Sequence, residues 1–212
     1  MQIAQDTVLE FARLGIVYAH LVACCVAIGL VLTSDIAMVR QLIKGDTSRM
    51  DMRHMRSLQT TVTAALVALW VTGVAVIALD MSTKGWPYLA NPKIQAKILI
   101  VVLLTINGVV LHHVVLPWMQ KAGSLLRLPP GKTLFAIFSG AASGVSWLYA
   151  AMLGVGRPLS WKYSLLELMA AYPLLIAGGF MSMLALTLIG THRAGESSRR
   201  GAEPLFGNAM AA

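Results

Sequence analysis

The chain has 212 residues and a net charge of +8, and 57% of its residues are hydrophobic while only 12% are charged. A soluble domain carries about a quarter of its residues as charges. This composition, with a mean hydropathy of +0.71, therefore excludes a water-soluble globular protein. The basic residues are spread over the loops rather than gathered in one patch, so the positive charge does not indicate binding to nucleic acid.

Five uncharged runs divide the chain into predicted membrane helices. Each run has at least 21 residues, and a helix needs about 20 to cross the hydrocarbon core of a bilayer. The runs cover residues 14–34, 57–79, 98–120, 133–156 and 168–192. The segments between them are too short to fold as separate domains. We therefore predict an all-α, polytopic membrane protein, in which residues 1–192 form one up-and-down bundle of five transmembrane helices.

The helix boundaries follow from the flanking residues. We expect helices near residues 8–38, 51–79, 92–119, 133–154 and 165–191. The pair Asn91-Pro92 has the form of an N-cap followed by proline at the first helical position, so it marks the start of the third helix. The polar, small-residue stretch 193–212 is predicted to be a disordered cytoplasmic tail.

Lysine and arginine are distributed unequally between the two sides of this bundle. Segments 40–56, 121–132 and 193–200 hold eleven of them, and the opposite side holds six. By the positive-inside rule, the N-terminus faces outward and the C-terminus faces the cytoplasm. The predicted location is the bacterial inner (cytoplasmic) membrane, which the chain crosses several times.

Ionisable side chains inside the predicted helices are the candidates for function, because each is costly in hydrocarbon unless it is paired or used. His20 lies in the outer half of the first helix, and Asp35 lies near its inner edge. The third helix places Lys97 at the outer edge and His112–His113 near the inner one. If these two helices are neighbours, His20 and Lys97 form an outer pair. Asp35 and the histidines then form an inner polar cluster, with Arg56 from the start of the second helix as a further partner for Asp35.

The outer pair has three interpretations. An intramembrane imidazole with a nitrogen donor opposite it is a typical arrangement for holding haem b between helices. Alternatively, His20 belongs to a proton or ion path. In the third interpretation, His20 is bonded to a backbone carbonyl while Lys97 extends its amine to the headgroups.

The fourth predicted helix contains small residues that favour close packing. Gly140 and Gly144 have the spacing of a small-xxx-small motif, which predicts that this helix docks on a second copy or on a larger membrane complex. Cys24 and Cys25 are adjacent on the first helix, where their side chains point about 100° apart. They are predicted to be packing residues rather than a disulfide.

Several segments resemble one superfamily, which contains the small bacterial membrane protoporphyrinogen oxidases and the copper-resistance D-type membrane proteins. These segments are YAH at 18–20, GL at 29–30, WVTG at 70–73 and QAKIL at 95–99, within a region of roughly residues 14–118. The resemblance implies that His20 and Lys97 are associated with haem b and activity. The chain departs from the oxidases at Ser34-Asp35, where they have a Pro-Arg pair, and so lacks one arginine that could bind a porphyrin propionate.

These observations support three hypotheses. In the first, the protein is a haem-b-type redox protein that acts in porphyrinogen oxidation or electron transfer with a porphyrin or a quinone-type partner. His20 is then the axial ligand, and Lys97 is the second ligand or a propionate partner. In the second, a metal or small solute is transported along Asp35, His112 and His113, so that His20, His112 and His113 are the candidate metal ligands. In the third, the protein is a non-catalytic subunit.

The topology can be tested directly. A reporter fused after Ala212 should report the cytoplasm, and a cysteine introduced in loop 82–86 should react with an impermeant thiol reagent from outside. If the loop cysteine reacts only after lysis, the orientation is reversed while the five-helix bundle stands.

Overall fold

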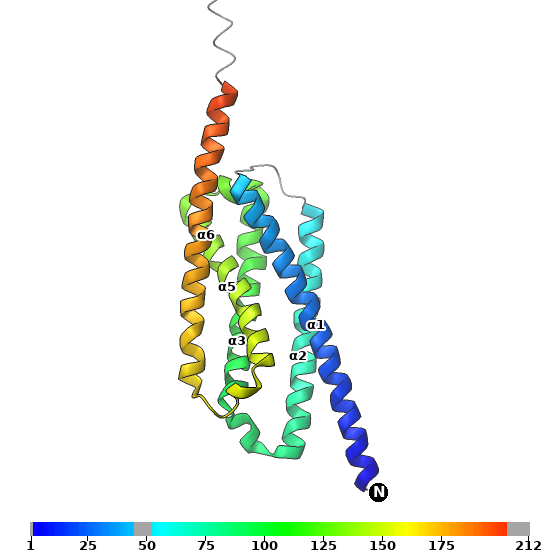
Figure 1. The fold of residues 1–212 in the computed structure, drawn as a ribbon. Helices are drawn as coiled ribbons and strands as arrows, with labels where there is room; N and C mark the ends of the chain where they lie inside the picture. Colours follow the sequence, from blue (N-terminus) through cyan, green and yellow to red (C-terminus); the bar gives the residue numbers. More distant parts are fainter. Residues whose placement is uncertain (1, 45–51, 203–212) are drawn as a thin grey trace, which may run out of the picture.

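A computed structural model describes the backbone of residues 2–44 and 52–202, with the side chains of residues 7–44, 57–156 and 158–195. Within these ranges the chain forms long helices joined by short connections (Figure 1). Five segments are long and apolar enough to cross a membrane, which confirms the predicted all-helical class. They are Thr7–Lys44, Ser57–Lys84, Pro92–Ala122, Pro130–Val155 and Leu165–Gly195.

The elements follow the predicted order. The α-helices are α1 (Gln2–Lys44), α2 (Met52–Lys84), α3 (Pro92–Val110), α4 (Leu116–Ala122), α5 (Pro130–Val155) and α6 (Leu165–Ala202). Short 3₁₀ segments form the connections, at η1 (Trp86–Ala90), η3 (Leu125–Arg127) and η4 (Arg157–Leu159). A π-helical turn, η2 (Leu111–Val115), joins α3 to α4.

Two helices extend well beyond their predicted ends. α1 begins at Gln2 rather than near residue 8, and α6 continues to Ala202, past the predicted start of the tail at residue 193. The predicted boundaries followed the apolar runs, but backbone hydrogen bonding does not stop where hydrophobicity stops. Residues such as Ala, Arg and Glu favour the helix in water as well. Residues 203–212 of the predicted tail lie outside the described residues.

Local sequence explains the start of α3 and the π-turn after it. Asn91 accepts a hydrogen bond from the backbone N–H of Lys93 at 3.0 Å, which confirms the predicted N-cap. Its side-chain amide also donates to Ser160 Oγ at 2.7 Å, so the cap joins the connection before α6.

Further along, Pro117 has no N–H to offer the carbonyl of residue 113. The backbone N–H of Leu116 instead bonds to Leu111, one residue further back than in an α-helix.

The helix α5 occupies the centre of the bundle. It packs against α3, α6 and α1, and its buried residues include Ser139, Ala141 and Ala142. Gly179 of α6 lies close to Ala141, where an added Cβ would be 3.6 Å away. Of the two glycines that predicted close packing, Gly144 lies against Asp35 of α1, whereas a Cβ added at Gly140 would meet nothing within 4 Å.

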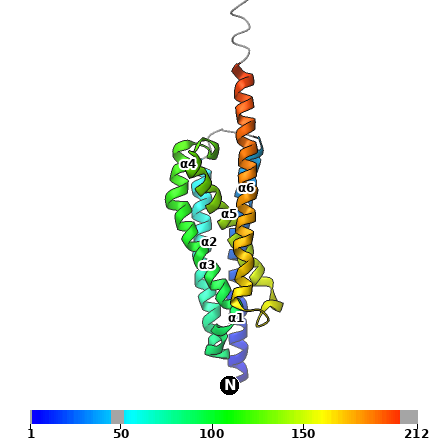
Figure 2. The ribbon, with the colours of Figure 1, turned by 90° about the vertical axis from the view of Figure 1, so that its left-hand side faces the viewer.

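The first helix runs obliquely across the bundle. In Figure 1, the upper end of the bundle holds Lys44 and α4, and the lower end holds η1 and η4. α1 lies beside α6 at the upper end and beside α2 toward the lower end, and its packing partners are α2, α6 and α5 rather than α3. Figure 2 shows α4 on the opposite side of the bundle from α6, while α3 slants toward α6 and packs against it. Midway along, Ala27, Ala65, Leu104 and Trp147 bring α1, α2, α3 and α5 into one buried cluster.

The close contact of α1 with α6 gives a stability prediction. A Cβ added at Gly190 would lie 2.5 Å from the carbonyl oxygen of Leu42, so Gly190→Ala should force the two helices apart. We expect a loss of about 1–3 kcal/mol, measured by unfolding in mixed detergent micelles. Gly178→Ala is the matched control on the same helix, because nothing lies within 4 Å of its added Cβ. Equal stability of the two variants would contradict the α1–α6 contact.

Candidate functional site

His20 of α1 lies against α2. Its Nδ1 is 2.8 Å from the hydroxyl oxygen of Thr72. Gly73 leaves room for the ring, since a Cβ at that position would be 3.6 Å from His20 Cε1. His20 is thus bonded to a threonine hydroxyl and not to the backbone carbonyl expected in the third interpretation of the outer pair. Thr72 and Gly73 both belong to the WVTG segment of the resemblance.

The hydrogen bonds of Thr72 define which nitrogen of His20 carries the proton. The hydroxyl of Thr72 donates to the carbonyl of Ala68 at 2.6 Å. A hydroxyl has a single hydrogen, so toward His20 the Thr72 oxygen acts as an acceptor. The Nδ1 of His20 is therefore the N–H donor, and its Nε2 carries the free lone pair. Metal-binding histidines typically have this arrangement, in which the second nitrogen donates to a fixed oxygen.

Lys97 of α3 belongs to the same polar region. Its charge interacts electrostatically with His20 and with Cys24, which follows His20 by one helical turn on α1. The ion pairs between described residues all use Asp80 as the acid, so none of them involves Lys97. No hydrogen bond joins Lys97 to His20 among the described residues, and α1 and α3 are not close packing partners, so the outer pair stays a prediction.

The predicted inner cluster is arranged differently from the expectation. Asp35 faces α5, where a Cβ on Gly144 would lie 3.0 Å from its Oδ2. His112 and His113 are both exposed, and their ring centroids are 4.9 Å apart. No hydrogen bond or ion pair between described residues joins Asp35 to either histidine. The side chain of Arg56, the other predicted partner, lies outside the described residues.

A second polar site, which sequence reasoning missed, is centred on Asp80 near the lower end of α2. Its side chain is only 4% exposed. Arg13 of α1 donates to both carboxylate oxygens, from Nε at 2.9 Å and from Nη2 at 3.2 Å. The hydroxyl of Tyr88 donates at 2.7 Å, and Lys84 Nζ lies 3.3 Å away. The available signal was the spacing of Asp80 and Lys84, four residues apart on one helix.

The Asp80 site fixes the part of α1 that carries His20. Arg13 and His20 are seven residues apart, about two turns, so both project from the same face of α1. That face is held on α2 at two points, by Arg13 on Asp80 and by His20 on Thr72. An unpaired carboxylate buried here would cost free energy, so the pairing of Arg13 with Asp80 fixes the position of α1 on α2.

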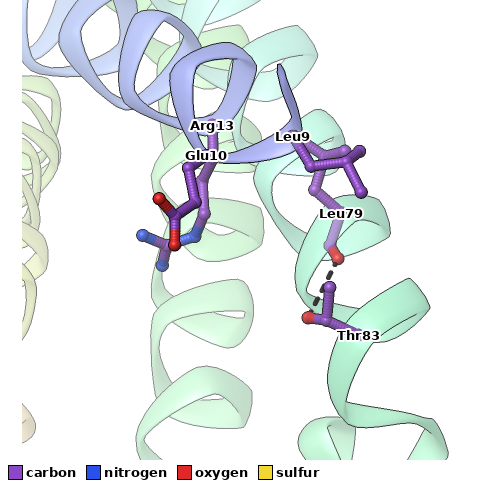
Figure 3. A pocket seen from close by; sticks show the side chains of 5 residues that line it. All are labelled: Leu9, Glu10, Arg13, Leu79 and Thr83. Atoms are coloured by element: carbon purple, nitrogen blue, oxygen red, sulfur yellow. Dashed lines mark hydrogen bonds between the residues drawn. The ribbon is translucent and has the colours of Figure 1, made fainter. Parts of the chain in front are cut away.

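A pocket of about 340 Å³ opens beside Arg13 at the α1–α2 contact. Figure 3 shows Glu10 and Arg13 projecting to one side of α1, while Leu9 lies toward Leu79 and Thr83 of α2. The Thr83 hydroxyl is bonded back to the carbonyls of Leu79 and Asp80. The pocket thus has two charged side chains beside a small apolar wall, and it lies on the N-terminal side of His20 along α1.

Tyr88 gives the Asp80 site a measurable pH dependence. Burial, together with its hydrogen bond to Asp80, raises the pKa of Tyr88 to about 12, from an ordinary value near 10. The folded protein therefore holds this proton more tightly than the unfolded chain does. The stabilisation is complete below pH 10 and is lost as the pH rises to about 12.

In Tyr88→Phe the decrease in stability over this range should be smaller than in the wild type, measured by denaturant unfolding. Tyr163→Phe, at an exposed position of the same end, should behave as the wild type, and identical curves for all three would contradict the contact.

No family model matches this chain, and no curated protein and no solved structure matches it. What the protein does must therefore be inferred from its own contacts, of which the bond between His20 and Thr72 is the most specific.

Proposed function

We propose that the protein binds haem b within the membrane, with His20 as the axial ligand, and acts in porphyrinogen oxidation or electron transfer. The observation that supports this most is the hydrogen-bonded series from His20 Nδ1 through Thr72 to the carbonyl of Ala68. It leaves Nε2 as an unprotonated donor and holds the ring against α2. An imidazole prepared in this way is a suitable ligand for iron, and the apolar side chains of α1 and α2 would suit the porphyrin ring.

The chain's own residues would hold and orient the group. His20 supplies the nitrogen donor, and Thr72 keeps its ring from rotating. Arg13 and Asp80 hold the same face of α1 in place, about two turns away. Bound haem would supply the one-electron chemistry that amino-acid side chains lack.

Lys97 has two possible roles toward the same group. As an ammonium it would pair with a propionate carboxylate, and as a free amine it would be a second nitrogen ligand. The first role is supported by its lack of an acidic partner among the described residues. Two other cations of this side, Arg13 and Lys84, already pair with Asp80. The second role requires deprotonation, which costs free energy at neutral pH.

We place this site in the outer half of a bacterial inner membrane, with the N-terminus outside and the C-terminus in the cytoplasm. The distribution of basic residues supports this orientation. Lysines and arginines without acidic partners in the described structure gather at the upper end of the bundle, at Arg40, Lys44, Lys121, Arg127, Lys132 and Arg193. Among the described residues, ion pairs occur only at the opposite end of the bundle, around Asp80.

The two other hypotheses have less support. A transport path along Asp35, His112 and His113 would need these side chains to line one route, but no hydrogen bond between described residues joins Asp35, which lies beside Gly144 of α5, to the exposed histidines. A docking role for the fourth predicted helix would need both glycines of its motif on the outside, but Gly144 lies against Asp35 of α1 and only Gly140 has open space beside it.

Substitutions give a definite order of effects on the haem spectrum. His20→Ala should abolish haem binding, measured as the Soret band and the dithionite-reduced α-band of the purified protein. Thr72→Val should weaken haem retention by about 10–100-fold, because the orienting acceptor is lost. Lys97→Ala should shift the spectrum or weaken retention to a smaller extent than His20→Ala. His54→Ala and His192→Ala are the controls and should leave the spectrum unchanged.

Two outcomes would contradict the proposal. The first is a colourless wild-type preparation although haem was available during expression. The second is a haem that depends on His112 or His113 and not on His20, which would move the cofactor to the other end of the bundle.

A further inference from the structure

His112 and His113 form an exposed pair of imidazoles in the π-helical turn between α3 and α4. Neighbouring side chains on an α-helix point about 100° apart. Here the ring centroids nevertheless lie 4.9 Å apart, with the ring planes at 57°. π-turns are rare and occur frequently at functional sites. The backbone at Pro117 therefore presents two adjacent metal-ligating side chains on one outer surface.

This pair lies within a membrane-spanning segment, Pro92–Ala122, and it lacks a partner in the bundle. No hydrogen bond or ion pair of either ring is found among the described residues, and both rings are exposed. Ile106 and Val109, on the preceding turns, are also exposed, by 57% and 55%. Lipid can cover those aliphatic side chains, but it cannot satisfy imidazole nitrogens. A ligand from outside the chain would do so.

The donor set identifies the class of that ligand. Two neutral imidazoles are good ligands for zinc and related transition metals, which take four ligands in a tetrahedral site. Within the described chain, no group of three or more His, Cys, Asp or Glu side chains is placed to hold a metal ion. Two ligands are thus present and two are missing.

A second copy of the chain can supply the missing two. Copies in one membrane share the same orientation, so a two-fold axis along the membrane normal brings identical residues together at the same depth. The exposed stripe of Val102, Ile106 and Val109 lies on the same helix, next to the histidines, and offers an apolar contact surface. We propose that His112 and His113 form half of a transition-metal site of the zinc type, completed by the same pair of a second copy.

This site is independent of the haem proposal, because it uses neither His20 nor Lys97. The test is a titration of the purified, metal-free protein with Zn²⁺ alone, followed by calorimetry for stoichiometry and by sedimentation for mass. We expect one zinc per two chains and a shift from monomer to dimer that a chelator reverses. His112→Ala/His113→Ala should lower the affinity for zinc at least tenfold and abolish the shift. Because both positions are exposed, the helix content of this variant, measured by circular dichroism, should equal that of the wild type.

The matched control removes two imidazoles elsewhere. His20→Ala/His192→Ala should bind zinc and dimerise as the wild type does, even where it has lost haem. The proposal is overturned if zinc does not bind, if one zinc binds per chain without a dimer, or if the zinc-dependent dimer persists in His112→Ala/His113→Ala.

Discussion

Three polar contacts between helices in this bundle use the same arrangement, a hydroxyl that bonds back to its own helix. Thr72, Thr105 and Ser146 each donate their hydrogen to the carbonyl four residues earlier, at Ala68, Val101 and Ala142. The hydroxyl oxygen is then an acceptor for a side chain from a neighbouring helix. Because hydrocarbon offers no hydrogen bonds, both ends of each such contact must be satisfied within the protein.

Hydroxyls of this kind join α1 to α2, α2 to α3 and α5 to α6. His20 of α1 bonds to Thr72 of α2, and the indole of Trp70 on α2 donates to Thr105 of α3 at 3.0 Å. The phenol of Tyr172 on α6 bonds to Ser146 of α5 at 2.8 Å. Two of these donors, an indole and a phenol, have no other chemistry to offer here. His20 is different, because its second nitrogen remains a free donor, and the same arrangement thereby prepares a ligand.

Ionisable side chains of the spans are satisfied unequally, and Asp35, like Lys97 and the histidine pair, has no hydrogen bond or ion pair among the described residues. Asp80, the buried acid, receives hydrogen bonds from two side chains and an ion pair from Lys84, and is therefore a structural anchor. Lys97 and the His112–His113 pair have no hydrogen bond or ion pair among the described residues. A membrane protein retains such groups at a cost, and a bound ligand is a physical reason to retain them. Haem near Lys97 and a shared metal at the histidine pair would each remove one of these costs.

The sequence by itself determined the features that depend on neighbouring residues along the chain. Uncharged runs predicted the five spans, and Asn91-Pro92 predicted the N-cap of α3, because hydropathy and capping are local properties. The grouping of His20 with Lys97, expected from equal depths on two helices, stays a prediction. Depth along a helix can be counted in residues, at about 1.5 Å each.

Only the tertiary structure decided which faces meet. Sequence placed Asp35 and the histidines at similar depths, but Asp35 faces Gly144 of α5, while His112 and His113 are exposed. It gave no sign that Arg13 would reach Asp80, 67 residues away. Nor did it show that His20 would meet Thr72. The rotation of each helix about its axis depends on packing between side chains distant in sequence, such as Ala27, Ala65, Leu104 and Trp147, and this packing is not encoded in any local pattern.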